Sequence, residues 1–363
     1  MTLRDIGEFG LIERIHARFG GNPPAEPAAE PAAAPAAQTP SSKVHPAPSS
    51  SAALGIGDDC AVIERPGDLL ELVTTDLLIE DSHFLRDAID PRQLGRKSLA
   101  VNLSDVAAMG GRPRAAFLSL ALPGEIELDW VDAFLEGVDD RLSESGVELL
   151  GGDTTRSKGL IVIQFTILGD VERSHLKLRS AAQPGDIICV TDSIGDSGGG
   201  LQALLDGVER TPAVEQLVRK HLDPRPHLAE GAWLGSCRGV HAMIDLSDGL
   251  ESDIRRIMER SHCGAEIEVS QLPISSELQE VSAEHRWSAW ELAVGGGEDY
   301  ALLCSVAPDL YQEIAEGYRH GLGGELHAVG RVTADGVGND PVYLYEGRRV
   351  DPTRRGFDHF RSE

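Results

Sequence analysis

The chain has 363 residues, of which 41% are hydrophobic and 25% charged, a composition typical of a globular protein long enough for two domains. Its formal net charge is −26, from 33 Lys and Arg against 59 Asp and Glu, and such a field excludes nucleic acid and an anionic membrane surface as broad electrostatic partners. The five cysteines form no C-x-x-C pair, which favours reduced thiols in the cytoplasm over a disulfide frame or a zinc site.

The N-terminal half is predicted to alternate between strands and helices after one low-complexity tract. Residues 22–53 are rich in Pro, Ala and Ser and cannot bury enough apolar surface to order themselves, which predicts a flexible insertion after a short helix at 9–19. Apolar residues at helical spacing predict a helix over 91–110 that stops at Gly110 and Gly111. The other elements predicted in this half are strands at 69–76, 115–123, 147–153 and 160–170 and an amphipathic helix at 127–146.

A second unit is predicted to follow, so that residues 1–170 form one domain and residues 171–363 another. The longest apolar stretch, at 160–168, is too short to span a bilayer, and no membrane segment is expected. The pattern indicates an α/β fold of the mixed α+β kind. The second unit contains strand candidates at 184–192, 265–269, 300–306, 325–332 and 342–347, a Gly-rich segment at 195–205 and a helix at 251–264.

Carboxylates recur in short motifs where an apolar run passes into small residues, most of them at the ends of predicted strands. Any one of these motifs is more typical of a turn or a helix cap than of a binding site. Strand ends are nevertheless where α/β proteins place ligand sites, and converging carboxylates would repel one another unless hard cations lay among them. Oxygen-only ligands suit Mg²⁺. The residues concerned are Asp58, Asp59, Asp76, Asp105, Asp153, Asp245, Asp248, Glu298 and Asp299.

Spacing and glycine content refine this prediction. Asn102 and Asp105 are three residues apart on the predicted helix and therefore share one face. Glycine and hydroxyl residues at 73–76, 151–157 and 195–200 are of the kind that present backbone N–H groups to phosphate oxygens. The chain has no Walker A motif, no dinucleotide-binding G-x-G-x-x-G and no protein-kinase signature, so a nucleotide would be bound by another route.

Eight motifs, taken in order, resemble a known family. They are GIGDDCAV, TTD, HF, AVNLSDVAAMG, GGDTT, DLSDGL, GGGEDY and GFDHF, and with the sequence between them they cover essentially the whole chain outside 22–53. The ordered set resembles thiamine-monophosphate kinase, of the aminoimidazole-ribonucleotide-synthetase-like ATP-binding superfamily. The resemblance implies two domains, with a homodimer formed through the N-terminal domains and a nucleotide and substrate site completed by the C-terminal domain. It also implies phosphorylation of thiamine monophosphate to thiamine diphosphate, with ATP as co-substrate.

The resemblance also assigns roles by motif. It implies that Mg²⁺ is held by Asp59, Thr74, Thr75, Asp76, Asp105, Asp153, Asp245 and Asp248. It places Gly151, Gly152, Arg179 and Ser247 at ATP, and His83, Glu298 and Phe357 at the thiamine substrate. Two departures from the family pattern stand out: Thr74 lies where some relatives have Ser, and the 22–53 tract precedes the first metal motif.

The expected reaction needs no general base. A phosphate acceptor has a second pKa of about 6 and is mostly dianionic near neutrality. The obstacle is the repulsion between two polyanions, which metal ions held by carboxylates would reduce. The thiazolium cation of thiamine would favour an acidic neighbour such as Glu298 and an aromatic one such as Phe357. Cys60, which adjoins Asp59, is expected to be inert because nearby carboxylates raise the pKa of a thiol.

Other functions remain open at this stage. A selenophosphate synthetase would have a reactive Cys in a flexible N-terminal segment, and none precedes Cys60. A hydrogenase-maturation dehydratase would have a terminal Cys, whereas this chain ends FDHFRSE. A ring-closing synthetase is a further member of the superfamily. A non-catalytic protein that binds divalent metal or anions would hold the same carboxylates without producing ADP.

Overall fold

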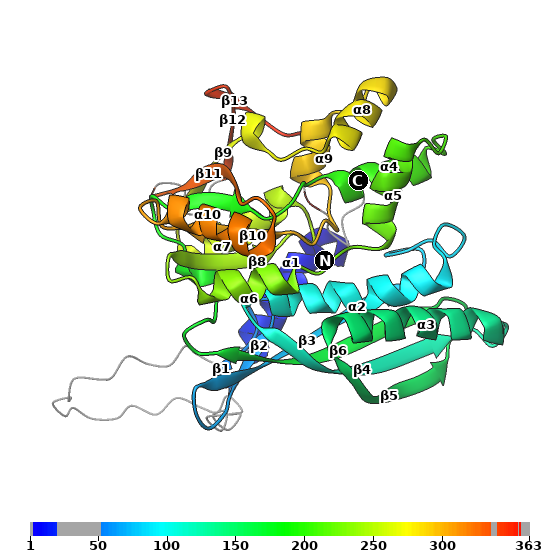
Figure 1. Cartoon of the computed structure of the whole chain (residues 1–363). Helices are drawn as coiled ribbons and strands as arrows, with labels where there is room; N and C mark the ends of the chain where they lie inside the picture. The colour runs from blue at the N-terminus through cyan, green and yellow to red at the C-terminus, as the bar shows by residue number, and fades with distance from the viewer. Residues whose placement is uncertain (1–2, 20–51, 335–339, 355, 357–363) are drawn as a thin grey trace.

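Two sheets form the framework of the protein. The structure is a computed structural model that describes residues 3–19, 52–334, 340–354 and 356. None of the helices in these residues combines the length and apolar character that a membrane crossing requires. The predicted mixed α/β class is confirmed, because both sheets are packed against helices (Figure 1). Of the 22–53 tract, only residues 52 and 53 fall in the described part, at the start of the first strand.

The first sheet has six strands in the order β1-β2-β3-β6-β4-β5, and only the β4–β5 pair is parallel. Along β3 and β6 every second side chain is buried, and helices α2 and α3 cover that buried face (Figure 1). The opposite face of β3, β4, β5 and β6 is open in the described part of the chain (Figure 1). The elements are β1 (Ala52–Leu54), β2 (Ala61–Glu64), β3 (Leu69–Ile79), α2 (Pro91–Ala108), β4 (Arg112–Leu122), α3 (Leu128–Ser145), β5 (Glu148–Arg156) and β6 (Val162–Glu172).

Helix α2 is fixed by its ends and by its crossing with α3. Asp90 caps its N-terminus, and its carboxylate accepts from the Arg92 N–H at 2.9 Å. The Gln93 side chain accepts in turn from the Asp90 N–H at 3.4 Å, as in a capping box. At the crossing, a Cβ on Gly95 would lie 2.1 Å from the Phe134 carbonyl oxygen. The two helix backbones therefore approach more closely than any larger residue at this position would permit. The predicted helix at 91–110 is confirmed, with its last two residues outside the helix.

The second sheet has seven strands in the order β13-β12-β9-β11-β7-β10-β8, with β12–β9 as its parallel pair. Its strands are β7 (Ile187–Val190), β8 (Val240–Asp245), β9 (Gly264–Glu268), β10 (Leu302–Val306), β11 (His327–Thr333), β12 (Val342–Tyr345) and β13 (Arg348–Val350). The helices of this half are α4 (Asp196–Leu205), α5 (Pro212–Leu222), α6 (Leu228–Ser236), α7 (Leu250–Ser261), α8 (Ser276–His285), α9 (Ala289–Gly295) and α10 (Tyr311–Leu322). Short 3₁₀ turns lie at Arg179–Ala181 and Val269–Gln271. The strands predicted at 184–192, 265–269, 300–306, 325–332 and 342–347 are confirmed, most with shorter bounds.

The N-terminal helix α1 (Leu3–Phe19) begins earlier than the predicted helix at 9–19. It bends at Gly7, where φ is 68° and the regular helical conformation is interrupted. The residues before and after this bend do not share one helical period. A prediction from apolar spacing therefore finds only the part of the helix after the bend.

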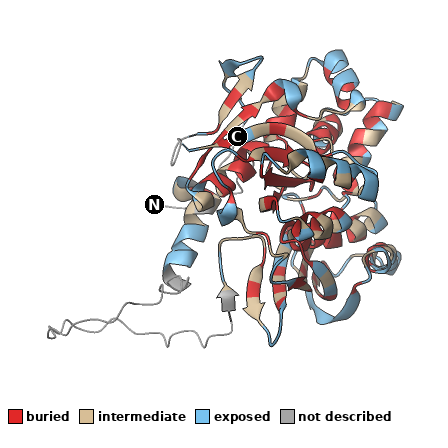
Figure 2. Cartoon of the chain, turned by 60° about the vertical axis from the view of Figure 1, so that its left-hand side comes forward, coloured by how far each residue is buried: buried red, intermediate tan, exposed pale blue. Residues whose placement is uncertain are grey.

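Helix α2 lies between the two halves and packs against β3 and β6 of the first sheet and against α6 and β8 of the second half. Buried residues continue from one half to the other across this contact (Figure 2). A network of charges reinforces it: Arg96 of α2 and Arg141 of α3 both bind Asp223, with N–O distances of 3.0 and 2.6 Å. The polar residues that α2 carries are therefore enclosed by both halves.

Candidate active site

Three carboxylates from distant parts of the chain meet at one point. Asp59 lies in the turn between β1 and β2, Asp105 on α2, and Asp245 at the end of β8. One oxygen from each lies within 4.8 Å of the others, as three ligands of one metal ion would. Two of these residues belong to the first half and one to the second, so the cluster exists only because the halves are packed together. The structure therefore brings these three residues together, and their role as metal ligands stays a prediction.

Polar side chains of α2 and β3 orient the cluster. The Thr74 hydroxyl donates to Asp105, and the Ser104 hydroxyl donates to Asp245 at 2.6 Å. The Asn102 side-chain oxygen accepts from the Asp76 N–H at 2.8 Å, which joins α2 to β3. Asn102 and Asp105 therefore act from one face of the helix, as their spacing predicts.

The cluster carries more negative charge than its neighbours neutralise. Burial, together with the charges of Asp248 and Asp59, raises the pKa of Asp76 to about 6. Burial and the charge of Asp59 raise the pKa of Asp245 to about 8. Burial, followed by the charges of Asp76, Asp245 and Asp59, raises the pKa of Asp105 well above its ordinary value. Such raised pKa values indicate a site built for a positive charge, because only a cation or bound protons remove the repulsion.

Arg179 supplies one positive charge to the cluster. Its guanidinium binds the Asp59 carboxylate at 2.5 Å, and its backbone N–H donates to Asp58 at 2.7 Å. Although burial opposes it, the charge of Asp59 raises the pKa of Arg179, which stays protonated. Among the described residues, Oδ2 of Asp58 and Oδ2 of Asp59 are buried without a hydrogen-bond partner. Buried anionic oxygens in that condition fit a hard divalent cation such as Mg²⁺.

A loop after β8 brings Asp248 to the edge of the cluster. Asp248 is held by Arg256 at 2.5 Å, and its backbone N–H donates to the buried carboxylate of Asp253 at 3.2 Å. Asp253 also accepts from the N–H of Gly249 at 3.1 Å and so fixes the turn that leads into α7. Sequence analysis missed Asp253, although a carboxylate at the fourth position of an amphipathic helix is a recognisable capping signal.

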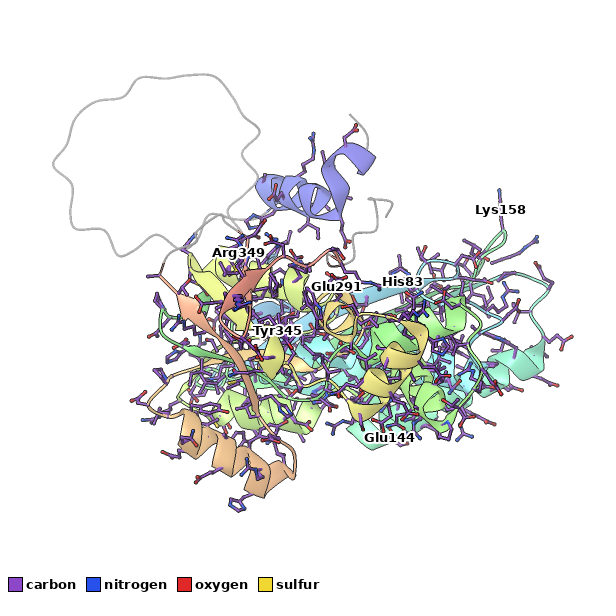
Figure 3. The ribbon with its side chains drawn as sticks, turned by 90° about the horizontal axis from the view of Figure 1, so that it is seen from above. His83, Glu144, Lys158, Glu291, Tyr345 and Arg349 are labelled. Carbon is purple, nitrogen blue, oxygen red and sulfur yellow. The ribbon has the colours of Figure 1, made fainter. Side chains whose placement is uncertain are left out.

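Glu298 lies beyond the cluster, beside a buried lysine and a buried histidine. Its Oε2 is 3.1 Å from Nζ of Lys97 on α2 and 3.3 Å from Nδ1 of His221 on α5. Burial and the charge of Lys97 lower the pKa of His221 to about 4, so near neutral pH Lys97 carries the positive charge of this pair. Burial alone would raise the pKa of Glu298, but Lys97 and His221 outweigh burial and lower it, and His83 contributes in the same direction. His83, labelled in Figure 3, lies after β3. Its Nδ1 accepts from the Ile79 N–H at 3.0 Å. The two predicted substrate residues His83 and Glu298 are therefore electrostatic neighbours.

Tyr300 connects Glu298 to the carboxylate cluster. The Tyr300 side chain is buried, and its pKa is raised well above the ordinary value by burial and then by Glu298 and Asp76, with smaller effects from Asp245 and Asp248. One phenol thus lies within electrostatic reach of Glu298 and of three of the carboxylates. Ser247 belongs to the same region, since its carbonyl accepts from the Glu298 N–H at 2.7 Å.

Four of the residues predicted to bind metal or ATP lie apart from the cluster in the described chain. Thr75 is exposed on the face of β3 opposite Asp76, because side chains alternate along a strand, and its hydroxyl donates to the Phe165 carbonyl at 2.9 Å. The other three are on β5, all of whose residues are exposed: Gly151, Gly152 and Asp153.

Strand pairing shows how far β5 is from the cluster. Asp76 pairs with Phe165, Phe165 with Leu118, and Leu118 with Gly152, a separation of three strand spacings or about 14 Å. Gly152 has φ of 150°, and a Cβ there would lie 1.7 Å from the Leu118 carbonyl oxygen. This glycine is therefore required by the close approach of β5 to β4, whatever ligand it meets.

Three further expectations concern Phe357, Cys60 and the Gly-rich segment at 195–200. Phe357 lies outside the described residues. Cys60 is buried, and burial followed by the charges of Asp105 and Asp59 raises the pKa of its thiol, in agreement with an inert cysteine. In the Gly-rich segment, the Asp299 carboxylate accepts from the Gly195 N–H at 2.6 Å and from the Ser197 N–H at 3.1 Å. The Asp299 carboxylate thus caps the N-terminus of α4 in this structure.

The sheets and helices are those of a known class. Residues 57–171 match the family model of the AIR synthase related protein N-terminal domain, and residues 183–340 match that of the C-terminal domain. The chain thus has the paired N- and C-terminal domains of the AIR synthase related proteins.

Individual relatives indicate which family within the AIR synthase related proteins this chain belongs to. The thiamine-monophosphate kinase of Haemophilus influenzae is 38% identical over 314 residues, which is 86% of this chain and 93% of the relative. Among solved structures, AaThiL complexed with AMPPCP and TMP has a TM-score of 0.79 at 30% identity, covering 99% of both chains. The thiamine-monophosphate kinase of Stenotrophomonas maltophilia K279a has a TM-score of 0.70 at 32% identity, covering 84% of this chain and 93% of the other. The chain belongs to the thiamine-monophosphate kinase family.

Proposed function

We propose that this protein transfers the terminal phosphoryl group of ATP to thiamine monophosphate, giving ADP and thiamine diphosphate. The observation that carries the proposal is the meeting of Asp59, Asp105 and Asp245 within 4.8 Å, in a chain 38% identical to thiamine-monophosphate kinases. A solved relative at 30% identity holds AMPPCP and TMP, which are an ATP analogue and the proposed acceptor. In the transfer, an acceptor phosphate oxygen bonds to the γ-phosphorus as the bond from that phosphorus to the β–γ bridging oxygen breaks.

We propose Mg²⁺ as the resident metal. Asp59, Asp76, Asp105, Asp245 and Asp248 would hold it, because their oxygens are hard ligands and the unpartnered buried oxygen of Asp59 fits a cation. When bound, Mg²⁺ neutralises phosphate charge and aligns the two substrates. The chain's own contribution is to bring these carboxylates together from both halves and to hold their orientation through hydrogen bonds from α2 and β3.

We propose that Arg179 and Ser247 contact ATP and that His83 and Glu298 contact the thiamine substrate. Arg179 stays protonated beside the cluster and offers a fixed guanidinium to phosphate oxygens. Glu298 stays ionised and offers a negative charge to the thiazolium ring.

The residues that lie outside the cluster keep their proposed roles in ATP and metal binding: Thr75, Gly151, Gly152 and Asp153. Their place on an open strand face and on an exposed edge strand makes their assignment the one that most needs a direct test. Asp153→Asn, compared with Asp132→Asn on the exposed surface of α3, should raise the Mg²⁺ concentration required for half-maximal rate. An unchanged requirement would remove Asp153 from the set.

We propose that the protein is a homodimer formed through the open face of the first sheet. Leu77 is 47% exposed on that face, and every residue of the edge strand β5 is exposed, with Leu150 at 55%. We also propose a cytoplasmic location, which the free thiols of all five cysteines support. Sedimentation of the protein should give twice the mass of one chain, and Leu77→Asp should shift it to a single-chain mass.

The test of the function is product formation. Purified protein, ATP and Mg²⁺ are incubated separately with thiamine monophosphate and with acceptors of the other superfamily enzymes, and ADP and the phosphorylated product are measured. Thiamine diphosphate should form in a one-to-one ratio with ADP. Turnover of another acceptor in its place would assign a different enzyme of the superfamily. Metal binding without ADP from any acceptor would indicate a non-catalytic protein.

A further inference from the structure

A buried lysine outside the carboxylate cluster has no part in the proposed chemistry. Lys97, on the second turn of α2, is 0% exposed. Its Nζ pairs with Oε2 of Glu298 at 3.1 Å, and this is its one ion pair among the described residues. Withdrawing an ammonium group from water is costly, and an apolar side chain would pack there at lower cost. The pairing with Glu298 therefore calls for a reason other than stability.

The backbone around Glu298 is also constrained. Glu298 has φ of 63°, a left-handed conformation that is unfavourable for a residue with a side chain, and its N–H is tied to the Ser247 carbonyl at 2.7 Å. Lys97 and His221 both engage Oε2, with His221 at 3.3 Å and itself 3.0 Å from the Ser197 hydroxyl. One oxygen of the carboxylate is thus held from two helices, which leaves Oε1 for a ligand.

The position of Lys97 on α2 links it to the metal cluster. The same helix carries Ser104 and Asp105, which fix the cluster two turns further along. A rigid helix that holds both Glu298 and Asp105 sets the distance between them. That distance must suit the acceptor, because its cationic ring and its phosphate are joined covalently.

We propose that Lys97 is a positioning residue for the acceptor substrate, holding the Glu298 carboxylate where it receives the cationic ring. The inference rests on the proposed function, since it names the residue that orients one of its substrate contacts. A positioning role for Lys97 can be distinguished from a purely structural role. In a positioning role, loss of the ammonium group weakens acceptor binding through Glu298 and leaves ATP binding unaltered.

A double-mutant cycle tests this directly. The rate is measured against thiamine monophosphate and against ATP for the wild type, Lys97→Met, Glu298→Gln and the double variant. Lys97→Met should raise KM for thiamine monophosphate about 10-fold to 100-fold, with kcat and KM for ATP nearly unchanged. In the Glu298→Gln background, Lys97→Met should add less than about 3-fold, because the group through which it acts is already altered.

Lys177→Met is the matched control. Lys177 is a second buried lysine, whose Nζ donates to the carbonyls of Cys237 and Val240 at 3.0 and 2.8 Å, away from Glu298. Its replacement should lower the melting temperature and leave KM for thiamine monophosphate unchanged. If Lys97→Met does not fold, Lys97→Gln, which removes the ammonium charge and has a shorter amide side chain, replaces it in the same cycle.

Two results would overturn the inference. One is an unchanged KM for thiamine monophosphate in the Lys97 variant, and the other is a double variant whose loss is the product of the two single losses. Failure of the proposed function is recognised separately, because the wild type would then produce no thiamine diphosphate, and both proposals would fall.

Discussion

The carboxylates of the cluster reduce the stability of the folded protein. Asp105 is half-buried and Asp245 is buried, both beside other carboxylates, and their pKa values are raised by withdrawal from water and by that repulsion. An asparagine at either position would accept the same hydrogen bond from Thr74 or Ser104 without a charge. Aspartate in these positions therefore serves binding at the expense of stability.

Asp105→Asn should separate activity from stability. We expect the rate of thiamine diphosphate formation to fall more than about 100-fold, since a carboxylate among several that would hold the metal is lost. The melting temperature in metal-free buffer should stay equal or rise, because a buried repulsion is removed. Asp248→Asn should lower the rate in the same way.

The control for both variants is Asp132→Asn, an exposed residue of α3, which should change neither quantity. A wild-type rate in the Asp105 or Asp248 variant would mean that this carboxylate has no metal role.

The candidate metal ligands that could be predicted from the sequence are those that stand in recognisable local motifs. Asp59, Asp105 and Asp245 stand in glycine-flanked or repeated motifs, and their convergence could be expected from those motifs. Lys97 and Asp253 were missed, because each acts through a partner that is distant in the chain or that lies in the backbone.

At the scale of the element, helix α2 organises the molecule. It buries one side against the first sheet, crosses α3 closely, and directs Lys97, Ser104 and Asp105 to partners in both halves. Its crossing with α3 depends on two glycines: a Cβ on Gly95 would lie 2.1 Å from the Phe134 carbonyl oxygen, and one on Gly137 would lie 1.8 Å from the Arg92 carbonyl oxygen.

Gly95→Ala should therefore destabilise the protein. Overpacking of this kind lowers the free energy of unfolding by about 1–3 kcal/mol, which denaturant titration measures. Gly159→Ala, in the turn after β5 where nothing lies within 4 Å of an added Cβ, is the control and should change the free energy of unfolding little. Equal stability of the two variants would show that α2 and α3 can move apart at little cost, and that their close approach does not require glycine at position 95.

Elements with an uninterrupted period were predictable, and those that depend on packing were not. Strands β3 and β6 alternate between buried and less buried residues and helix α3 is amphipathic, so the bounds of these elements differ from the predictions by a few residues. Helix α5 was not predicted, although Thr211 and Pro212 form a recognisable start with the Thr211 hydroxyl accepting from the Val214 N–H. Strand order, including the parallel β4–β5 pair, depends on contacts between distant segments that no local pattern contains.

At the scale of the whole molecule, the site is a property of the assembled halves. Asp59 and Asp105 come from the half that contains the first sheet and Asp245 from the half that contains the second, so separation of the halves would dissolve the cluster. Charge repulsion at this junction opposes assembly, and a bound divalent cation would favour it. Metal binding and overall stability should therefore be linked.

The linkage predicts a pH dependence. The folded-state pKa values of Asp76 and Asp245 are raised to about 6 and about 8, so their contribution to stability is complete at low pH and is lost as the pH rises through those values. Without metal, this contribution to the melting temperature should fall between pH 5 and pH 8. Mg²⁺ competes with those protons, so the increase in melting temperature that it produces should be larger at pH 8 than at pH 6.

Thermal melts at both pH values, with and without Mg²⁺, measure this increase. Asp245→Asn should reduce the difference between the two pH values. An increase that is equal at both, or larger at pH 6, would contradict the linkage.

The most direct experiment is a crystal structure with Mn²⁺, a non-hydrolysable ATP analogue and thiamine monophosphate, in which anomalous scattering locates the metal ions. Metal should appear within about 2.5 Å of carboxylate oxygens from Asp59, Asp105 and Asp245 together, and between them and the phosphates of both substrates. Ions bound elsewhere, with these three carboxylates free of metal while both substrates are bound, would contradict a site in which the two halves join around magnesium to bring two anions into reaction.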